Sequence, residues 1–344
     1  MAINVGVSGA TGAAGGVTLA LLRERNVPVG DLRLFASRRS AGRRVQWGDR
    51  EIEIEALEDG HFDGLDVVLN ATSASLAREW VPRMVEAGAF VSDKSSAFRQ
   101  APDVPLVIPE INGEDAKSHK GIVASPNCTT AVALMAIAPL HRAVGVRSVI
   151  SSSYQSVSGV GRDAVSELLE VNRKAVEQTD ALWGREPLDL PEPVAFPHPL
   201  AFNVFPQCET FLDGADSSTE EQKMQAESRK ILGAPELLLQ ATAVRVPVVV
   251  GHSVSLSLSL ERPVTPDEAR EVLAAFPGVR VLDEPGAKVY PTPQQATGID
   301  DVLVGRVRSN PVLPNGLALF ASGDNLRKGA SLNAIQIAEL VLGI

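Results

Sequence analysis

The segment Gly9-Ala-Thr-Gly-Ala-Ala-Gly15 constrains the fold of this chain more than any other part of its sequence. It follows a short apolar run at residues 3–8 and opens a helical pattern that ends near residue 25. Glycines between a strand and a helix let the backbone approach a pyrophosphate, whose charge then lies at the helix N-terminus. The strand–loop–helix order therefore predicts a dinucleotide-binding unit, whereas the alternative is a tight turn that binds no ligand.

Strands and helices alternate through the N-terminal part of the chain. Further strands are predicted at residues 32–36, 66–71 and 90–93, and a helix at residues 74–87. Such alternation predicts a parallel sheet covered by helices, which is an α/β architecture.

Longer strands follow residue 128. They are predicted at residues 148–156, 241–250 and 252–260, and the last of these alternates serine with apolar residues. This alternation is typical of a strand with one buried and one polar face, so we expect a large mixed or antiparallel sheet in a second domain.

Two other segments have a distinct composition. Residues 178–199 are rich in proline and acidic side chains and are predicted to form a surface excursion. Residues 325–342 form an apolar helical pattern, which we expect to pack against the first domain.

The composition excludes several classes of protein. The 344 residues carry a formal net charge of −10, which argues against a nucleic-acid footprint and against a polybasic membrane surface. No apolar run approaches the roughly 20 residues of a membrane-spanning helix, and the N-terminal segment has no basic targeting region. We therefore expect a cytoplasmic protein with no nucleic-acid or membrane partner. Two cysteines are too few for a disulfide framework.

Cys128 is the principal candidate for reactivity. It follows Pro126 and Asn127 and opens an apolar helical run. The N–H groups and the positive dipole end of a helix stabilise a thiolate, so the pKa of this thiol is expected to fall toward neutrality. The alternative is a small buried core residue.

The end of the second predicted strand bears on the choice of dinucleotide. An acidic residue there would bind the ribose of NAD, but this chain has Ser37-Arg38-Arg39-Ser40. Cationic and hydroxyl groups suit the 2′-phosphate of NADP, so NADP is the expected cofactor. The alternative is an ordinary basic surface loop.

With these residues in view, the chain resembles aspartate-semialdehyde dehydrogenase over nearly its full length. The resemblance rests on several motifs that occur in the family's order: Gly9-Ala-Thr-Gly-Ala, Ser95-Ser-Ala-Phe-Arg99, Pro126-Asn-Cys128, Tyr154-Gln-Ser-Val-Ser-Gly159, Ala201-Phe-Asn-Val, Arg245-Val-Pro-Val, Gly251-His-Ser253, Asp301-Val-Leu-Val-Gly-Arg306 and Asp324-Asn-Leu-Arg-Lys-Gly329. It implies NADPH-dependent reduction of L-aspartyl 4-phosphate to L-aspartate 4-semialdehyde and phosphate, in lysine, threonine and methionine biosynthesis. It also implies a homodimer or homotetramer of two-domain chains: a Rossmann-type NADP-binding domain (residues 1–127 with 325–344) and an α+β catalytic and dimerisation domain (residues 128–324).

The resemblance assigns roles in the reaction to four residues. Cys128 would attack the acyl phosphate and hold a thioester, His252 would be the acid/base, and Gln155, with Asn127, would orient the substrate and the intermediate. No metal is implied.

The charges of aspartyl phosphate require a guanidinium for the carboxylate, an anion for the ammonium and a second cationic site for the phosphate. The resemblance assigns these to Arg245 for the carboxylate, Glu220 for the ammonium, and Arg99 with Lys223 for the phosphate. Arg245 lies in an apolar predicted strand, so an inward guanidinium would need an anionic partner. The cofactor residues expected from the motifs and the resemblance are Gly9, Thr11, Gly12, Ala13, Ala14, Ser37, Arg39, Ser40, Ser158, Gly159 and Asn325.

The chain departs from the family pattern in two places. Residues 70–75 lack the expected paired glycines, and Lys94 stands where the family more often has Asn. Cys208 has no predicted helix N-terminus and is expected to be structural.

Two rival functions are less well supported. N-acetyl-glutamyl-phosphate reductase uses the same thioester chemistry, but its acylated substrate gives Glu220 no ammonium to bind. A non-catalytic NADP-binding redox sensor would leave the cations Arg99, Lys223 and Arg245 without a function.

Overall fold

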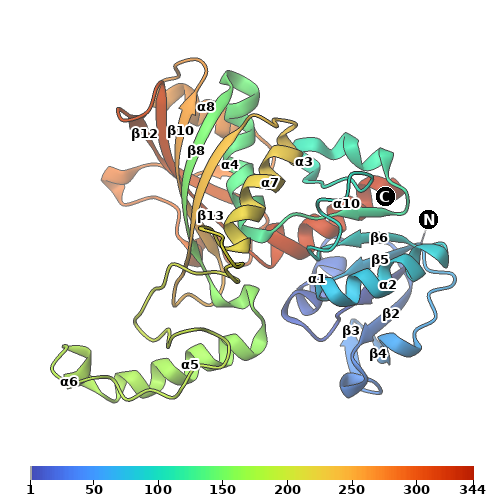
Figure 1. Ribbon diagram of the computed structural model, residues 1–344. Helices are drawn as coiled ribbons and strands as arrows, with labels where there is room; N and C mark the ends of the chain where they lie inside the picture. Colours follow the sequence, from blue (N-terminus) through green and yellow to red (C-terminus); the bar gives the residue numbers. More distant parts are fainter. Residues whose placement is uncertain (1) are drawn as a thin grey trace.

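The computed structural model describes residues 2–344, and these form two sheets with their helices (Figure 1). The strands are β1 (Ile3–Ser8), β2 (Val29–Ala36), β3 (Arg44–Trp47), β4 (Arg50–Ala56), β5 (Val67–Asn70), β6 (Phe90–Asp93), β7 (Ile122–Ala124), β8 (Val146–Gln155), β9 (Leu238–Arg245), β10 (His252–Leu260), β11 (Val279–Val281), β12 (Val302–Asn310) and β13 (Gly316–Gly323). The helices are α1 (Ala13–Glu24), α2 (Ala74–Glu86), α3 (Pro109–Asn112), α4 (Cys128–Val144), α5 (Arg162–Val176), α6 (Thr179–Leu182), α7 (Thr219–Leu232), α8 (Pro266–Ala274), α9 (Pro293–Ala296) and α10 (Leu332–Leu342).

The first sheet has the order β3-β4-β2-β1-β5-β6-β7, and all its pairs are parallel except β3 with β4. One face packs apolar side chains of α1 and α10, including Leu21 and Ile335. The other face packs Trp80, Val81 and Met84 of α2. The sheet is therefore buried on both faces, as parallel sheets usually are.

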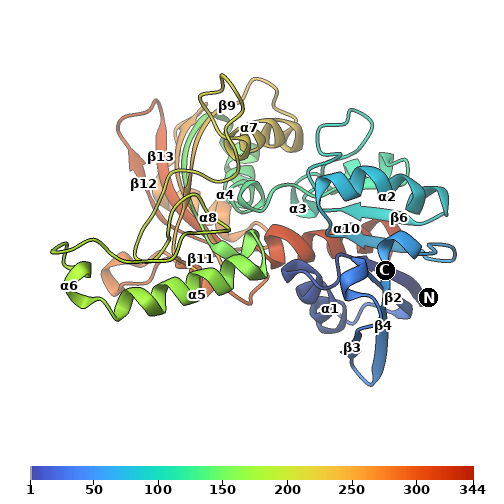
Figure 2. The same ribbon diagram turned by 60° about the horizontal axis from the view of Figure 1, so that its bottom comes forward.

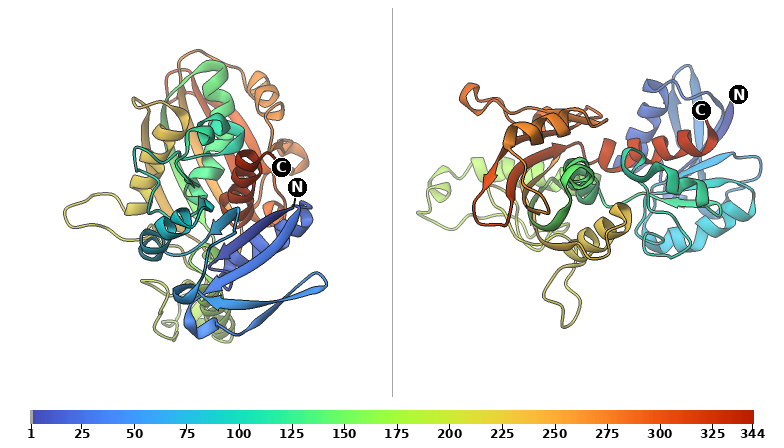
Figure 3. Two further views of the ribbon diagram at one scale, coloured as in Figure 1. Left: turned by 90° about the vertical axis from the view of Figure 1, so that its right-hand side faces the viewer. Right: turned by 90° about the horizontal axis from the view of Figure 1, so that it is seen from above.

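The C-terminal helix returns to this first sheet. α10 follows a π-helical turn at Arg327–Ser331 and lies among the N-terminal elements, as Figure 3 shows in red beside blue. Arg25 of the loop after α1 donates to both carboxylate oxygens of Glu339 on α10, over 2.8 and 2.7 Å.

The second sheet has the order β11-β12-β13-β10-β8-β9 and is mixed. Its β10 pairs antiparallel with both β8 and β13, whereas β8 pairs parallel with β9. Helix α4 packs its apolar side chains against one face of the sheet, in the core that also holds Leu256 and Leu319. The predicted mixed sheet is confirmed.

One predicted strand end was wrong. The strand expected at residues 241–250 ends at Arg245, because the chain turns there through Pro247 and Val248 toward the site. Residues 178–199 are surface segments as predicted, but they begin with the short helix α6, beyond α5 in Figure 2. Across residues 2–344, no helix combines the length and the apolar composition that crossing a membrane requires.

Candidate active site

Cys128 is the first residue of α4, and a side chain from the preceding residue caps this helix. Asn127 Oδ1 accepts hydrogen bonds from the backbone N–H groups of Thr129 and Thr130, over 2.8 and 3.2 Å. The predicted placement of Cys128 in the first turn is confirmed. Because Asn127 takes these two donors, the end of the helix is held rigidly beside the sulfur.

His252 begins β10 and contacts the thiol directly. Its Nε2 lies 3.2 Å from Cys128 Sγ. The backbone N–H of Ser156 donates to Nδ1 over 3.1 Å, and since this group can only donate, the contact favours the tautomer with its proton on Nε2. The Ser156 hydroxyl lies 3.0 Å from the same Nδ1 and can accept its proton in the other tautomer.

Burial controls the ionisation of both groups. It lowers the pKa of His252 to about 3, and the charge of Arg245 acts in the same direction. Burial also raises the pKa of the Cys128 thiol, while Lys94 and Arg99 oppose that rise. The lowered thiol pKa expected from the sequence is therefore wrong for this structure, because the loss of hydration outweighs the nearby cations.

A cavity of about 360 Å³ adjoins the thiol and is lined by polar groups from several elements. Glu220, near the start of α7, accepts from Gln155 Nε2 and Asn127 Nδ2, both over 2.9 Å. It is only 3% exposed, and burial raises its pKa. Gln155, Asn127 and Glu220 therefore form one hydrogen-bonded wall beside Cys128.

Arg245, the last residue of β9, lies on another part of this cavity. It is 7% exposed, and its Nη1 donates to the backbone carbonyl of Ser156 over 2.6 Å. Its guanidinium lies 6.0 Å from the ring centre of Phe196. Among residues 2–344 it forms no ion pair with a carboxylate. A buried cation in this state is suited to an anionic ligand.

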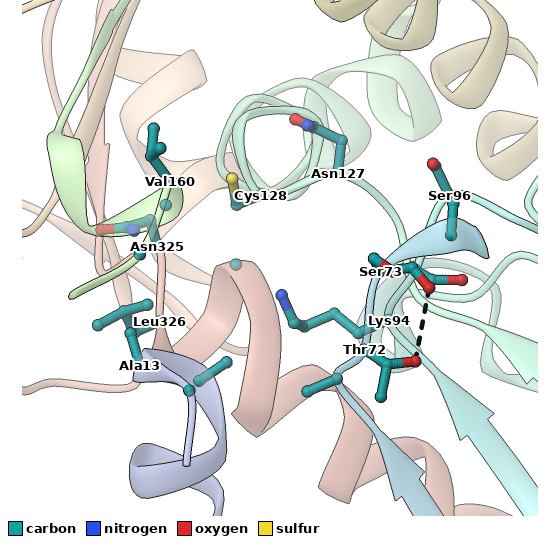
Figure 4. A pocket seen from close by; sticks show the side chains of 18 of the residues that line it. Ala13, Thr72, Ser73, Lys94, Ser96, Asn127, Cys128, Val160, Asn325 and Leu326 are labelled. Atoms are coloured by element: carbon teal, nitrogen blue, oxygen red, sulfur yellow. Dashed lines mark hydrogen bonds between the residues drawn. The ribbon is translucent and has the colours of Figure 1, made fainter. Parts of the chain in front are cut away.

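A second cavity, of about 430 Å³, also adjoins Cys128, and Figure 4 shows it with Asn127 and Lys94. Arg99 and Lys223 line it too. Both cations have carboxylate partners. Arg99 Nη1 donates to Glu227 over 3.0 Å, and Lys223 donates to both oxygens of Glu209. Thus Lys223 does not pair with Glu220 on the same helix, and the two face different cavities.

The phosphate loop borders the same cavity. A Cβ on Gly15 would lie 2.4 Å from the carbonyl oxygen of Gly9, so only glycine fits where α1 begins. Beyond the loop, a cavity of about 740 Å³ is lined by Thr11, Arg39 and Ser40. These features fit a dinucleotide whose pyrophosphate lies at the N-terminus of α1.

The segments after β8 and β13 add groups to the cofactor side. Asn325 Oδ1 accepts from the hydroxyls of Ser156 and Ser158, over 3.1 and 3.3 Å. Gly159 is adjacent to His252, since a Cβ there would lie 3.6 Å from Nε2. Two expected cofactor residues, Gly9 and Ser37, do not line these cavities, whereas Gly12, Ala13, Ala14, Ser158, Gly159 and Asn325 line the cavity beside Cys128.

Sequence reasoning missed Glu227 and Glu209. Glu227 is 1% exposed, and it also accepts from the backbone N–H of Asn127 over 2.7 Å. Its spacing of seven residues from Glu220 on one helix was the available signal. The pairing of Glu209 with Lys223 joins a loop to α7 and had no such signal.

Two further observations limit the chemistry. Cys208 is 2% exposed, and burial raises its pKa to about 12, which disfavours its thiolate at neutral pH. In the part of the chain that the structure describes, no cluster of three or more His, Cys, Asp or Glu side chains could hold a metal ion.

Comparisons with known proteins identify the family of this chain. The family model "Semialdehyde dehydrogenase, NAD binding domain" matches residues 4–119, and "Semialdehyde dehydrogenase, dimerisation domain" matches residues 137–328. These matches confirm the predicted fold class.

Individual relatives match over the full length. The aspartate-semialdehyde dehydrogenase of Mycolicibacterium smegmatis is 46% identical and covers 98% of this chain and 99% of the relative. That of Aquifex aeolicus is 42% identical and covers 99% of this chain and 98% of the relative. The crystal structure of aspartate semialdehyde dehydrogenase II from Vibrio cholerae, complexed with ASA, has a TM-score of 0.92 at 35% identity, covering 100% of this chain and 99% of that one. This chain therefore belongs to the aspartate-semialdehyde dehydrogenase family.

Proposed function

We propose that this protein reduces L-aspartyl 4-phosphate to L-aspartate 4-semialdehyde and phosphate with NADPH, through a thioester on Cys128. The contact of 3.2 Å between Cys128 Sγ and His252 Nε2 carries the proposal, because it places an acid/base imidazole beside the nucleophile. The relatives of this name support the substrate, and one of them is complexed with ASA.

His252 has the contacts that moving the thiol proton requires. The step uses the other tautomer, in which Nδ1–H donates to the Ser156 hydroxyl and Nε2 can take the proton from the sulfur. The sulfur then attacks the acyl carbon, a C–S bond forms, and the C–O bond to the phosphoryl group breaks. NADPH, when bound, supplies the hydride that reduces the thioester. As the C–S bond breaks, the proton held at His252 is available to the collapsing thiohemiacetal.

Arg245 and Glu220 would select the free amino acid. A guanidinium pairs with a carboxylate through two parallel N–H···O bonds, and Arg245 has no other carboxylate partner among the described residues. Glu220 would bind the ammonium, and Gln155 and Asn127 would orient the substrate and the intermediate. An N-acetylated substrate could not satisfy Glu220 in this way, which disfavours N-acetyl-glutamyl-phosphate reductase.

Arg99 and Lys223 would bind the phosphoryl group, since both line the cavity of about 430 Å³ that adjoins Cys128. Arg39 would bind the 2′-phosphate of NADPH, since it lines the cavity beyond the phosphate loop without a carboxylate partner among residues 2–344. The neighbouring Arg38 instead donates to Asp59 over 2.7 Å.

The remaining assignments follow the same family. We place the enzyme in the cytoplasm, in lysine, threonine and methionine biosynthesis, and divide it into the domains 1–127 with 325–344 and 128–324. We also propose a homodimer, or a tetramer built from it, through the sheet face that α4 does not cover. Ile150 and Tyr154 lie on that face and are 50% and 39% exposed.

The reverse reaction tests the function. Purified protein with L-aspartate 4-semialdehyde, phosphate and NADP should produce NADPH, and omission of phosphate should stop it. N-acetyl-glutamate semialdehyde is the control and should be a poor substrate. Equal rates with the two aldehydes, or a rate independent of phosphate, would reject this function.

A further inference from the structure

Lys94 is a cation that the roles described above do not use. It follows the last residue of β6, at the carboxyl edge of the first sheet, where parallel α/β folds bind their ligands. Its side chain extends into the cavity of about 430 Å³, and Figure 4 shows its nitrogen in the space between Cys128 and Ala13.

The other cations of this cavity each have a carboxylate partner. Arg99 is paired with Glu227, and Lys223 is paired with Glu209. Throughout residues 2–344, the Lys94 ammonium has neither an ion pair nor a hydrogen bond, although its backbone carbonyl accepts from Arg99 Nη2 over 2.7 Å. Lys94 is therefore the cation of this cavity with no carboxylate partner.

The nearest carboxylate along the chain is occupied by other donors. Asp93 Oδ1 accepts from Asn70 Nδ2 and Asp93 Oδ2 accepts from the Ser95 hydroxyl, both over 2.7 Å. Burial lowers the pKa of Lys94, and the charge of Cys128 is the largest effect that raises it. An anion bound beside the ammonium would restore its preference for the charged form.

We propose that Lys94 binds a phosphate oxyanion beside Cys128. The inference rests on the proposed function, which supplies two sources of this chemistry: the phosphoryl group that leaves the substrate and the pyrophosphate of the dinucleotide. The phosphoryl group is the expected source, because the backbone N–H groups at the start of α1 already suit the pyrophosphate.

Alkylation of Cys128 measures anion binding without turnover. Iodoacetamide modification of the full-length protein, free of dinucleotide, is followed by mass spectrometry at increasing concentrations of inorganic phosphate. The half-protecting concentration is compared among wild type, Lys94→Met and Lys94→Arg, with the exposed Lys120→Met as control. A parallel titration measures NADPH affinity by fluorescence.

Lys94→Met should raise the half-protecting phosphate concentration by about tenfold or more, because a charge-assisted contact is lost. Lys94→Arg keeps the charge and should change the half-protecting phosphate concentration by less than about threefold. A loss confined to NADPH affinity also supports the anion site and identifies the pyrophosphate as its source. Unchanged affinity for both ligands in Lys94→Met would overturn the proposal.

The experiments distinguish failure of the proposed function from failure of the anion site at Lys94. If wild type does not oxidise aspartate semialdehyde, the proposed function fails, whereas protection by phosphate still reports on Lys94. If Lys94→Met does not fold, Lys94→Asn, with the residue more usual in the family, is measured against Lys94→Arg in the same assay. Equal phosphate affinity in Lys94→Asn and Lys94→Arg would overturn the proposal that Lys94 binds the anion.

Discussion

The guanidinium of Arg245 is buried without a carboxylate, in a cavity that it shares with Glu220. Lys cannot reproduce its planar pair of donors, so Arg245→Lys should raise the KM for aspartate semialdehyde by about ten- to a hundredfold in the reverse reaction. The KM for phosphate should change much less.

The exposed Arg147 of β8 provides the matched control, since Arg147→Lys keeps the same chemistry away from the cavity. It should leave both Michaelis constants unchanged. If Arg245→Lys altered only the KM for phosphate, the assignment of Arg245 to the substrate carboxylate would be wrong.

Arg39 and Arg38 are neighbours with different environments. Arg39 lines the cofactor cavity, whereas Arg38 is paired with Asp59. Arg39→Ala should weaken NADPH binding by about tenfold or more while NADH binding changes little, because only NADPH carries the 2′-phosphate. Arg38→Ala should affect neither. Isothermal titration with both dinucleotides measures this, and equal losses for the two would contradict the 2′-phosphate contact.

At the scale of elements, the site depends on ends of helices and strands that the sequence locates well. The cap at Asn127, the first turn at Cys128 and the loop before α1 follow from local patterns, because each depends on residues within a few positions. The end of β9 was misplaced, since residues 246–250 are as apolar as the strand itself. Apolar pattern alone does not distinguish a strand from an adjoining buried turn.

The pairing of charges could not be read from the sequence. Arg99 pairs with Glu227, which lies 128 residues further along the chain. Lys223 of α7 pairs with Glu209, which lies in the loop before that helix. The Arg99 contact depends on how the second domain packs against the first sheet, and the Lys223 contact depends on the path of the loop before α7. The same limit explains why the sequence predicts no role for Lys94, since its lack of a carboxylate partner is visible only once its neighbours are paired.

The π-helical turn before α10 is held by one buried cation. Lys328 is 1% exposed and donates to Glu110, and also to Asn333 and Gln336 over 3.1 and 2.8 Å. A Cβ on the next residue, Gly329, would lie 2.8 Å from the Cβ of Cys128. The turn therefore packs directly against the nucleophile.

Removing this cation should destabilise the protein. Lys328→Ala leaves Glu110 without its buried partner, so we expect the free energy of unfolding to fall by about 3–5 kcal/mol. Lys117 pairs with Glu114 on the surface, so Lys117→Ala should change the free energy of unfolding by less than about 1 kcal/mol. Urea denaturation of both variants measures the difference. Equal effects would mean that the Lys328 network contributes no more than a surface pair.

At the scale of the whole molecule, the second sheet is covered on one face only. Helix α4 buries the inner face, whereas Ile150 and Tyr154 of β8 are exposed on the outer face, and the Tyr154 ring lies 6.0 Å from that of Phe320 on β13. Exposed apolar side chains grouped on one sheet face favour burial against another chain. The match to a semialdehyde dehydrogenase dimerisation domain spans these strands.

Placing a charge on this face should therefore dissociate the assembly. Wild type should sediment at twice the 36.4 kDa chain mass, or at a multiple of it, and Ile150→Asp should shift it toward the single chain because a carboxylate would be buried in an apolar contact. Ile344→Asp is the matched control, since Ile344 is 41% exposed but lies at the end of α10, on the first domain. Sedimentation equilibrium over a range of concentrations measures both. A monomeric wild type, or an Ile150→Asp variant that associates as tightly as Ile344→Asp, would show that the chains do not meet through this face.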